Sequence, residues 1–264
     1  MKAIVFVKEV PETPEGVSVS ENGQVQAAGG GNFLTDPIDP FAIETALQIK
    51  DAKGGEVHAV TAGNSRAEKI LKEALAMGVD NSYLVADDAL EGSDPNAIAR
   101  VLAGAAKKIG DYDLLVTGDR AADDNSSIVT AALAQLLDIP VLTFVSEVVD
   151  FDADAKKIRV VRTLENGRQV MEATLPAVIS VMKGIHEPRY PSLLGIRKAS
   201  KREVPSWSLA DIGVDPSTVG AAGSPTKIRS LDPPPAPSGV EMITGSPEEM
   251  AATLVQRIMD KKVL

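Results

Sequence analysis

The sequence predicts an α/β protein with a doubly wound, mostly parallel sheet and helices on both faces. Short apolar runs alternate with segments of helical periodicity through roughly the first half of the chain, a pattern typical of β-α-β units. Two of these runs end in glycine, at Ala62-Gly63 and at Thr117-Gly118. In a parallel sheet we expect both turns to lie on the same edge, outside the carboxyl ends of the strands.

The first strand is expected from Lys2 to Val7, where the residues are mostly apolar. Pro11 and Pro14 prevent it from continuing, because proline cannot donate to a strand ladder. A turn-rich excursion follows, with breakers at Asn22-Gly23 and at 29–31.

The first helix opens with Asp39 as the expected cap and Pro40 in its first turn. We then expect strands at 56–61 and 79–85, a helix at 66–76 capped by Ser65, and a helix that begins at Asp94-Pro95.

The stretch from Asp113 to Leu137 is the candidate ligand site. It reads as a strand at 114–117, a polar turn at 118–125, and a helix whose expected buried face is formed by Ile128, Val129, Ala132, Leu133 and Leu136. A turn between a parallel strand and a helix offers unpaired backbone N–H groups to an anion, and Ser126, Ser127 and Thr130 add hydroxyls. The stretch therefore predicts a phosphate or nucleotide cradle.

An ordinary helix start is the alternative for the same residues. Asp123, Asp124 and Asn125 suit the capping of a helix amino terminus whether or not a ligand binds. The turn has a single cation, Arg120. The two carboxylates would repel a phosphate unless they turn away or bind a ribose.

The second half of the chain changes pattern. A strand begins after Pro140, alternation on both sides of Glu165-Asn166-Gly167 predicts a hairpin, and residues 177–182 form another apolar strand. Residues 214–239 are rich in Pro, Gly and Ser, and 233–235 favour extended backbone. Ser246 to Glu249 fit a capping box before an apolar stripe of Met250, Leu254, Val255 and Ile258. We therefore expect an α/β domain over 1–205 and an extended arm over 206–264. Its terminal helix is expected to dock on a partner subunit, and docking on its own domain is the alternative.

Composition excludes several function classes. The chain has no cysteine and only two histidines, which rules out disulfides, thiol catalysis and histidine-rich metal sites. A net charge of -10 and 3% aromatic residues disfavour nucleic acid as a ligand. No apolar run is long enough for a membrane span, and Lys8 and Glu9 interrupt any signal peptide, so we expect a cytoplasmic protein.

Several segments, in order, resemble the small, or β, subunit of electron-transfer flavoproteins. They are VKEVPET at 7–13, DPIDPFAIE at 36–44, ALAMGVD at 74–80, GDRAADD at 118–124, LPAVISV at 175–181 and EPRYPSLLGIRKASKRE at 187–203. The resemblance implies a Rossmann-like, adenine-nucleotide-binding fold and a heterodimer whose large α subunit holds the redox FAD. It also implies electron transfer from flavin dehydrogenases, such as acyl-CoA dehydrogenases, towards the quinone pool, without catalytic side chains in this subunit.

The resemblance also implies site residues. AMP or a second FAD would bind at Phe6, Asp36, Asp39, Ala62, Gly63, Gly118, Ala121, Asp123, Asp124, Asn125, Ser126, Ser127, Ile128, Val129 and Thr130. Thr13 and Ile38 would face the flavin of the partner. The loop that matches 191–201 would recognise dehydrogenases, with Leu193 as anchor, among the residues Arg189, Leu193, Leu194, Ile196, Arg197 and Lys198. Packing of Leu193 and Leu194 under their own loop is the alternative.

Two departures from the family leave the β-site nucleotide open. Ile128 and Thr130 replace a glutamine and a glycine that many relatives carry, and Asp124 stands where bifurcating relatives have glycine. AMP, FAD or an empty site are therefore all possible readings, as is bifurcation of electrons from NADH. A stand-alone adenine-nucleotide sensor is the alternative from another class. An ATP-cleaving adenylating enzyme ranks last, because the first strand lacks a glycine-serine phosphate loop.

Overall fold

The computed structural model describes residues 1–12, 17–19, 25–27, 32–227 and 239–262. It divides the chain into two compact units, Met1–Arg229 and Ser230–Leu264. The boundary lies later than the predicted 205/206, because residues that follow 205 pack on the first unit. Among them, strand β13 (Ser206–Trp207) pairs in parallel with strand β7 (Asn81–Val85). The predicted extended segment at 233–235 lies outside the described residues.

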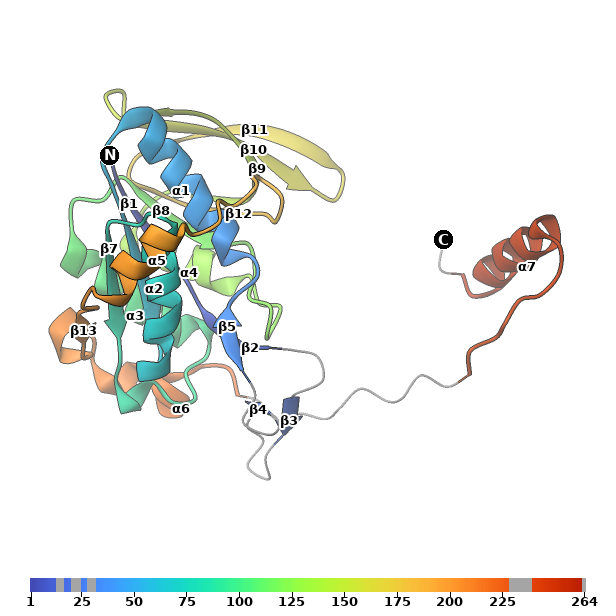
Figure 1. Ribbon diagram of the computed structural model, residues 1–264, viewed down its shortest axis with the longest axis horizontal. Coiled ribbons are helices and arrows are strands. Elements are labelled where there is room, and N and C mark those ends of the chain that lie inside the picture. The colour runs from blue at the N-terminus through green and yellow to red at the C-terminus, as the bar shows by residue number, and fades with distance from the viewer. Residues whose placement is uncertain (13–16, 20–24, 28–31, 228–238, 263–264) are drawn as a thin grey trace. The chain divides into compact units, whose positions relative to one another are not determined.

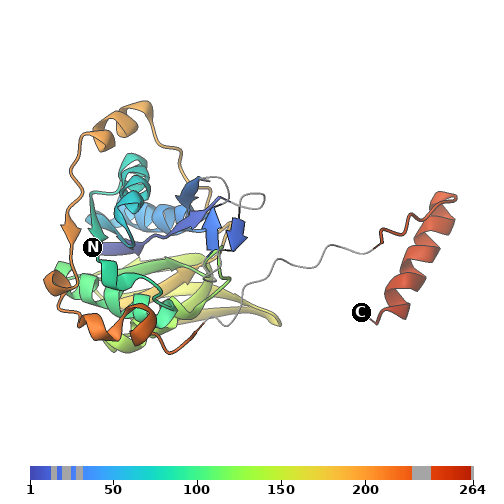
Figure 2. The ribbon, with the colours of Figure 1, turned by 90° about the horizontal axis from the view of Figure 1, so that it is seen from below.

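The first unit is a three-layer α/β sandwich (Figures 1 and 2). Its sheet has the strand order β11-β10-β9-β12-β8-β1-β6-β7-β13. The remaining strands of this sheet are β1 (Lys2–Phe6), β6 (Glu56–Ala62), β8 (Leu114–Gly118), β9 (Val141–Asp152), β10 (Lys157–Leu164), β11 (Gly167–Thr174) and β12 (Ala177–Val181). All pairings are parallel except those of β10 with β9 and β11. The predicted doubly wound, mostly parallel fold is confirmed.

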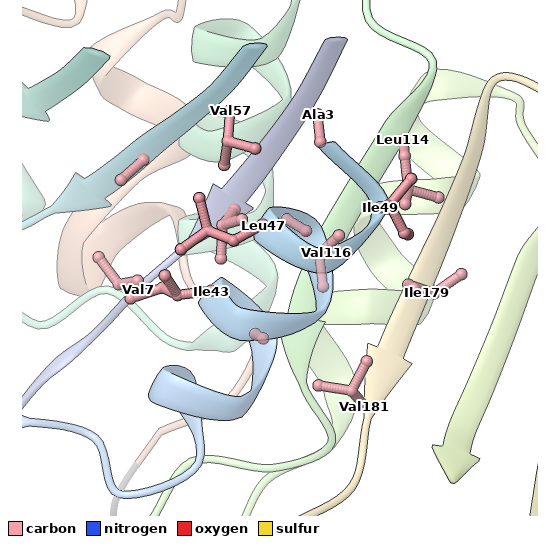
Figure 3. Close-up of a cluster of buried hydrophobic side chains, with 14 of the residues drawn as sticks. Ala3, Val7, Ile43, Leu47, Ile49, Val57, Leu114, Val116, Ile179 and Val181 are labelled. Atoms are coloured by element: carbon pink, nitrogen blue, oxygen red, sulfur yellow. The ribbon is translucent and has the colours of Figure 1, made fainter. Parts of the chain in front are cut away.

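Helices cover both faces of the sheet, and each face has its own hydrophobic core. Helices α1 (Asp39–Lys53) and α2 (Glu68–Met77) cover one face, and α3 (Pro95–Ile109) and α4 (Ile128–Leu137) cover the other. Figure 3 shows Ile43 and Leu47 of α1 in one cluster with Val116 of β8. Strand β1 sends Val5 to this core and Ile4 to the opposite one. Burial on both faces explains why its sequence is a continuous apolar run.

Of three helix starts, one forms as the sequence predicts and two differ in detail. Asp94 caps α3 as predicted, since its side chain accepts the Ala97 N–H at 2.9 Å. Asp39 does not cap α1: it is the first helical residue, and its carboxylate accepts the Lys8 N–H at 2.6 Å instead. The turn before α2 is capped by Asn64 and not by Ser65. Short carboxamide and hydroxyl side chains are interchangeable in a sequence pattern, so only geometry selects between them.

The predicted buried face of α4 is partly wrong. Ile128 and Leu136 are 44% and 40% exposed, whereas Thr130, Leu133 and Ala134 are buried. The helix is apolar nearly all round, so its composition could not identify the face that meets the sheet.

The remaining elements complete the first unit. The predicted hairpin is confirmed by β10 and β11, where Leu164 pairs with Gly167. A helix, α5 (Leu193–Ser200), occupies the segment expected to be a loop. Two small antiparallel strand pairs lie outside the main sheet: β2 (Glu9–Pro11) with β5 (Phe33–Thr35), and β3 (Val17–Val19) with β4 (Val25–Ala27). The short helical segments are η1 (Ser65–Ala67), η2 (Asp88–Leu90), η3 (Ala210–Ile212), η4 (Pro216–Thr218) and α6 (Gly220–Gly223).

The second unit contains helix α7 (Pro247–Asp260). The predicted capping box is confirmed: the Glu249 carboxylate accepts the Ser246 N–H at 2.8 Å, and the Ser246 hydroxyl accepts the Glu249 N–H at 3.3 Å. Leu254 and Val255 of its apolar stripe are 51% and 55% exposed. Other described residues of this unit therefore leave the stripe uncovered.

Candidate functional site

The sheet has a topological switch point between β1 and β8. From β1 the chain moves to β6 and β7 on one side, and then returns to β8 and β12 on the other. Both β6 and β8 run parallel to β1, so their carboxyl ends share one edge, here called the rim. This confirms that the two glycine-ended strands deliver their turns to the same edge. A rim at a switch point is where open α/β sheets bind ligands.

Lys8 spans this switch point, although it was not singled out in the sequence. It follows β1, and its ammonium lies 2.6 Å from the Asp123 carboxylate and 3.9 Å from that of Asp124, both in the turn after β8. The side chain of Lys8 is 44% exposed. The rim therefore holds a cation that only the fold brings to the acidic turn.

Asp36 connects the start of α1 to the same turn. It is buried, and its carboxylate accepts the Ile38 N–H at 3.0 Å and the Ala122 N–H at 2.6 Å. Asp39 is buried beside it, and burial, together with the charge of Asp36, raises the pKa of Asp39 well above its ordinary value. The rim thus rests on two buried carboxyl groups that position backbone.

The turn after β8 is largely closed by its own hydrogen bonds. Ala121 donates its N–H to the Ser126 carbonyl at 3.1 Å, and Asn125 donates to the Ala121 carbonyl at 2.9 Å. Asn125 adopts a left-handed conformation with φ 52°. The Ser126 hydroxyl accepts the Ile128 N–H at 3.3 Å. These contacts give the turn a defined shape that does not depend on a ligand.

Thr130 uses its hydroxyl inside the protein. Its side-chain oxygen lies 2.7 Å from that of Thr117 in a buried hydrogen bond, and Thr130 is only 3% exposed. This residue was predicted to contact a nucleotide. Its hydroxyl is committed to Thr117, so only its backbone N–H in the first turn of α4 is suited to that role.

The two rim glycines differ in how much room they have. A Cβ atom on Gly118 would lie 3.0 Å from Ile38 Cγ2 and 3.3 Å from Asp39 Oδ1. A Cβ atom on Gly63 would meet only Ala67 Cβ, at an ordinary 3.6 Å. Packing of α1 against β8 therefore explains Gly118, whereas the described residues leave room for a side chain at Gly63.

The other predicted rim residues occupy different depths. Phe6 is 5% exposed and belongs to the core on the α3 and α4 side, so it supports the rim from below. Ala62 ends β6 across β1 from the turn, and Ile38 packs on Gly118. Thr13 lies outside the described residues.

Asp119 is a buried rim residue that sequence reasoning missed. It follows Gly118, is 2% exposed, and among the described residues none donates a hydrogen bond to either of its carboxylate oxygens. The Arg120 guanidinium approaches one of these oxygens to 3.3 Å. Burial raises the pKa of Asp119, and Arg120 opposes that shift. Its position after the strand-ending glycine was the available signal.

The groups at the rim fit a ligand that combines hydroxyls with a phosphate. Lys8, the hydroxyl of Ser127 and the first-turn N–H groups of α4 suit an anion. The carboxylates of Asp123 and Asp124 suit hydroxyl donors such as those of a ribose. A phosphate would compete with Asp123 for the Lys8 ammonium. The residues present therefore fit a sugar phosphate such as the ribose phosphate of a nucleotide, subject to that exchange.

Helix α5 presents the second predicted surface. The Ser192 hydroxyl caps it by accepting the Gly195 N–H at 2.9 Å. Leu193, Leu194 and Ile196 are 83%, 61% and 49% exposed. The two leucines thus do not pack under their own loop, and that alternative is wrong. Exposed apolar side chains grouped on one short helix are typical of a protein-binding surface.

Among the predicted recognition residues, Arg197 and Lys198 of α5 are exposed. Arg189 instead forms ion pairs within the protein. The Arg189 guanidinium donates to Glu44 and to Asp51 of α1. A surface cavity of about 500 Å³ lies between α2 and α5 and is lined in part by Ala76, Ile196 and Ala199. This cavity adjoins the exposed face of α5 and is separate from the rim.

Two further kinds of feature are absent from the described residues. No helix there is long and apolar enough to cross a membrane. No group of three or more histidine or acidic side chains there is arranged to hold a metal ion.

Comparison with known proteins agrees with the sequence resemblance. Residues 27–212 match the family model described as the electron transfer flavoprotein domain. The CarD subunit of the caffeyl-CoA reductase-Etf complex of Acetobacterium woodii is 36% identical, with 100% of each chain covered. The electron transfer flavoprotein subunit beta of Thermoanaerobacterium thermosaccharolyticum is 35% identical, also with 100% of each chain covered. FixA of Azotobacter vinelandii is 34% identical over 89% of this chain and 84% of FixA.

Proposed function

Because this chain belongs to the electron transfer flavoprotein family as a β subunit, we propose that it is the small subunit of a heterodimeric, cytoplasmic electron carrier. In this role it receives electrons from flavin dehydrogenases of the acyl-CoA dehydrogenase type and passes them to a quinone-reducing acceptor. The observation that carries the proposal is the rim at the β1/β8 switch point, where Lys8, Asp36 and Asp123 converge from distant parts of the chain.

The redox flavin in this proposal is an FAD held mainly by the large α subunit, and it supplies the electron chemistry. This chain contributes position. Ile38, packed on Gly118 at the start of α1, would support the flavin from the rim side together with Thr13. No side chain of this chain is assigned a catalytic role.

The rim would hold a nucleotide of its own, AMP or a second FAD. Its phosphate would take the Lys8 ammonium and the first-turn N–H groups of α4 near Ser127, while Asp123 and Asp124 would face the ribose hydroxyls. AMP would indicate a simple carrier, and a second FAD would indicate bifurcation of electrons from NADH. With either ligand, the phosphate would displace Asp123 from the Lys8 ammonium.

Helix α5 would dock the dehydrogenase. Its exposed leucines offer a small apolar anchor, and Arg197 and Lys198 lie beside them. A small contact of this kind suits a carrier, because a carrier must release its partner quickly. The name of the Acetobacterium relative places it in a complex with a CoA-ester reductase, which supports an enzyme of CoA-ester redox chemistry as the partner.

Purification with the candidate large subunit tests the proposal. The two chains should co-purify as a heterodimer with FAD, and denaturation should release the nucleotides for counting. One FAD with one AMP supports the simple carrier, two FAD support bifurcation, and one FAD alone would refute the nucleotide site at the rim. A stable monomer that binds adenine nucleotide and forms no complex would refute the carrier role in favour of a stand-alone sensor.

A further inference from the structure

We propose that Arg189 and Arg202 are positioning residues that clamp helix α5 onto the body of the protein and so fix the place of Leu193, a role that rests on the docking function proposed above for α5. The two arginines lie on either side of the helix, and both reach back to buried or well-anchored groups. Neither guanidinium is left free for a partner protein.

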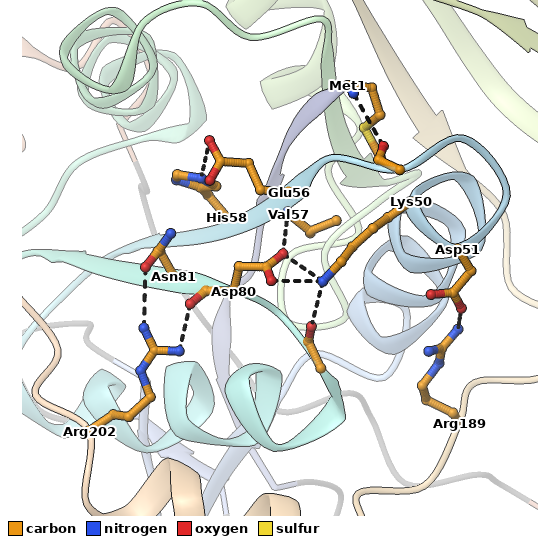
Figure 4. Close-up of polar contacts among 12 residues, drawn as sticks. Met1, Lys50, Asp51, Glu56, Val57, His58, Asp80, Asn81, Arg189 and Arg202 are labelled. Carbon is orange, nitrogen blue, oxygen red and sulfur yellow. Dashed lines mark hydrogen bonds and ion pairs between the residues drawn. The ribbon is translucent and has the colours of Figure 1, made fainter.

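Arg189 makes the stronger of the two clamps. Its Nε donates to Glu44 Oε2 at 2.7 Å and its Nη2 donates to Glu44 Oε1 at 3.0 Å, a two-pronged pairing that only a planar guanidinium can form. Its backbone N–H donates to the same carboxylate at 3.1 Å. Nη2 also donates to Asp51 Oδ2 at 2.8 Å, as Figure 4 shows.

Glu44 is the reason why this clamp is specific. It is 4% exposed on α1, so its charge is buried and needs a partner. Burial by itself raises the pKa of Glu44, but the hydrogen bonds from Arg189 and from Gln48 outweigh it and leave that pKa below the ordinary value. The carboxylate is therefore charged and committed to Arg189 at neutral pH.

Arg202 closes the other end of the segment. Its Nη1 donates to the Asp80 carbonyl at 2.6 Å and its Nη2 to Asn81 Oδ1 at 3.2 Å. The Asp80 side chain is held in turn by Lys50 of α1, at 2.7 Å, and by the Val57 N–H, at 2.8 Å (Figure 4). Both clamps therefore lead to α1, through Glu44 and Asp51 on one side and through Lys50 on the other.

Close packing between the clamps leaves α5 little freedom. A Cβ atom on Gly195 would lie 2.6 Å from the Ala76 carbonyl oxygen at the end of α2. The backbone of α5 therefore packs directly against the backbone of α2, and only glycine fits at this position. A surface that is fixed before binding avoids the entropy cost of ordering it during the encounter. Helix α1 contacts Arg189 directly and holds the side chain of Asp80, the partner of Arg202, through Lys50, and it begins at the rim with Asp39. Helix α1 thus connects the rim to the contacts that hold the docking surface.

Hydrogen exchange of the heterodimer, followed by mass spectrometry over 193–200, tests the clamp directly. Arg189→Lys keeps the charge but loses the bidentate pairing with Glu44, and Asp51→Asn removes only the negative charge of the outer contact. We expect faster exchange in α5 for Arg189→Lys, a smaller effect for Asp51→Asn, and none for Arg168→Lys. Arg168 is a matched control because it forms an exposed ion pair with Glu147 on the hairpin, at 3.2 Å. Exchange in Arg189→Lys equal to that of the wild type would overturn the clamp.

Steady-state electron transfer from a purified acyl-CoA dehydrogenase, with its acyl-CoA substrate, tests the consequence. For Arg189→Lys and Arg202→Lys the KM for the heterodimer should rise about threefold to tenfold. This fold-change corresponds to the entropy cost of ordering one or two side chains during binding. The kcat and the FAD content should stay unchanged. A fall in kcat with unchanged KM, or unchanged kinetics despite faster exchange in α5, would overturn the positioning role.

Leu193→Ala in the same assay separates this inference from the proposed function. If Leu193→Ala raises KM and the arginine variants do not, the docking role of α5 stands and the positioning role is refuted. If Leu193→Ala has no effect, the docking role of α5 fails, whereas hydrogen exchange still decides whether the arginines hold the helix.

Discussion

The carboxylate of Asp36 accepts the backbone N–H of Ala122 at 2.6 Å, across 86 residues of chain. The segment before α1 thereby fixes the turn after β8. Because the other oxygen of Asp36 accepts the Ile38 N–H, one buried side chain sets the relative position of the two loops that would enclose a nucleotide.

Asp36→Ala should lower both the stability and the nucleotide content. The buried N–H of Ile38 and the partly buried N–H of Ala122 would both lose their acceptor, at a cost of about 1–3 kcal/mol in the free energy of unfolding. Chemical denaturation measures the stability, and release of nucleotide from the heterodimer measures binding. Asp36→Asn, which keeps one acceptor oxygen, should fall between the wild type and Asp36→Ala. An alanine variant that matches the wild type in both measurements would contradict this role.

Asp39→Asn should stabilise the protein at neutral pH. The pKa of Asp39 is raised above 3.8 in the folded state, first by burial and then by the charge of Asp36. A raised pKa means that the folded state binds the proton more tightly than the unfolded state, so stability is lost as the pH rises through the folded pKa. An asparagine has no such loss and still accepts the Lys8 N–H.

The measurement is the melting temperature against pH, from 2 to 8. The advantage of Asp39→Asn over the wild type should grow as the pH rises. Asp113→Asn is a control of opposite sign: burial raises the pKa of Asp113, but hydrogen bonds from Lys156 and Lys2 outweigh it and lower that pKa. Its stabilising charge is fully present above pH 3.8 and is lost as the pH falls below that value, so the disadvantage of Asp113→Asn should be constant above about pH 4 and should vanish at lower pH. Parallel curves for both variants would refute the assignment.

Gly118→Ala and Gly63→Ala should separate packing from ligand binding. The new methyl group at 118 would press on Ile38 and Asp39, and overpacking of this kind costs about 1–3 kcal/mol. The methyl group at 63 has room, so Gly63→Ala should fold with near wild-type stability. A loss of nucleotide from Gly63→Ala at unchanged stability would show that a ligand approaches this backbone. Equal stability of the two variants would contradict the packing role of Gly118.

Thr130→Val should destabilise the protein, because it leaves the buried hydroxyl of Thr117 without its partner at 2.7 Å. The expected loss is about 1–3 kcal/mol. The double variant Thr117→Val with Thr130→Val removes both hydroxyls and should recover most of the stability, since valine has nearly the same shape as threonine. A double-mutant cycle by chemical denaturation measures this coupling. Additive losses would show that the two hydroxyls act independently.

Local signals in the sequence determined much of the fold. The apolar run at β1, the Asp94 cap of α3, the hairpin turn between Leu164 and Gly167, and the capping box of α7 all form as predicted. Each depends on residues within a few positions of one another, so chain connectivity alone brings the partners together.

Only the tertiary structure decided which residues meet at the rim and beside α5. Lys8 reaches Asp123 across 115 residues, and Arg189 reaches Glu44 across 145. These pairs form because the strand order places β8 next to β1 and because α1 crosses above both. A side chain's partner at such separations depends on the arrangement of the whole sheet, which no local pattern encodes, and so the sequence could name the candidate residues but not the contacts that employ them.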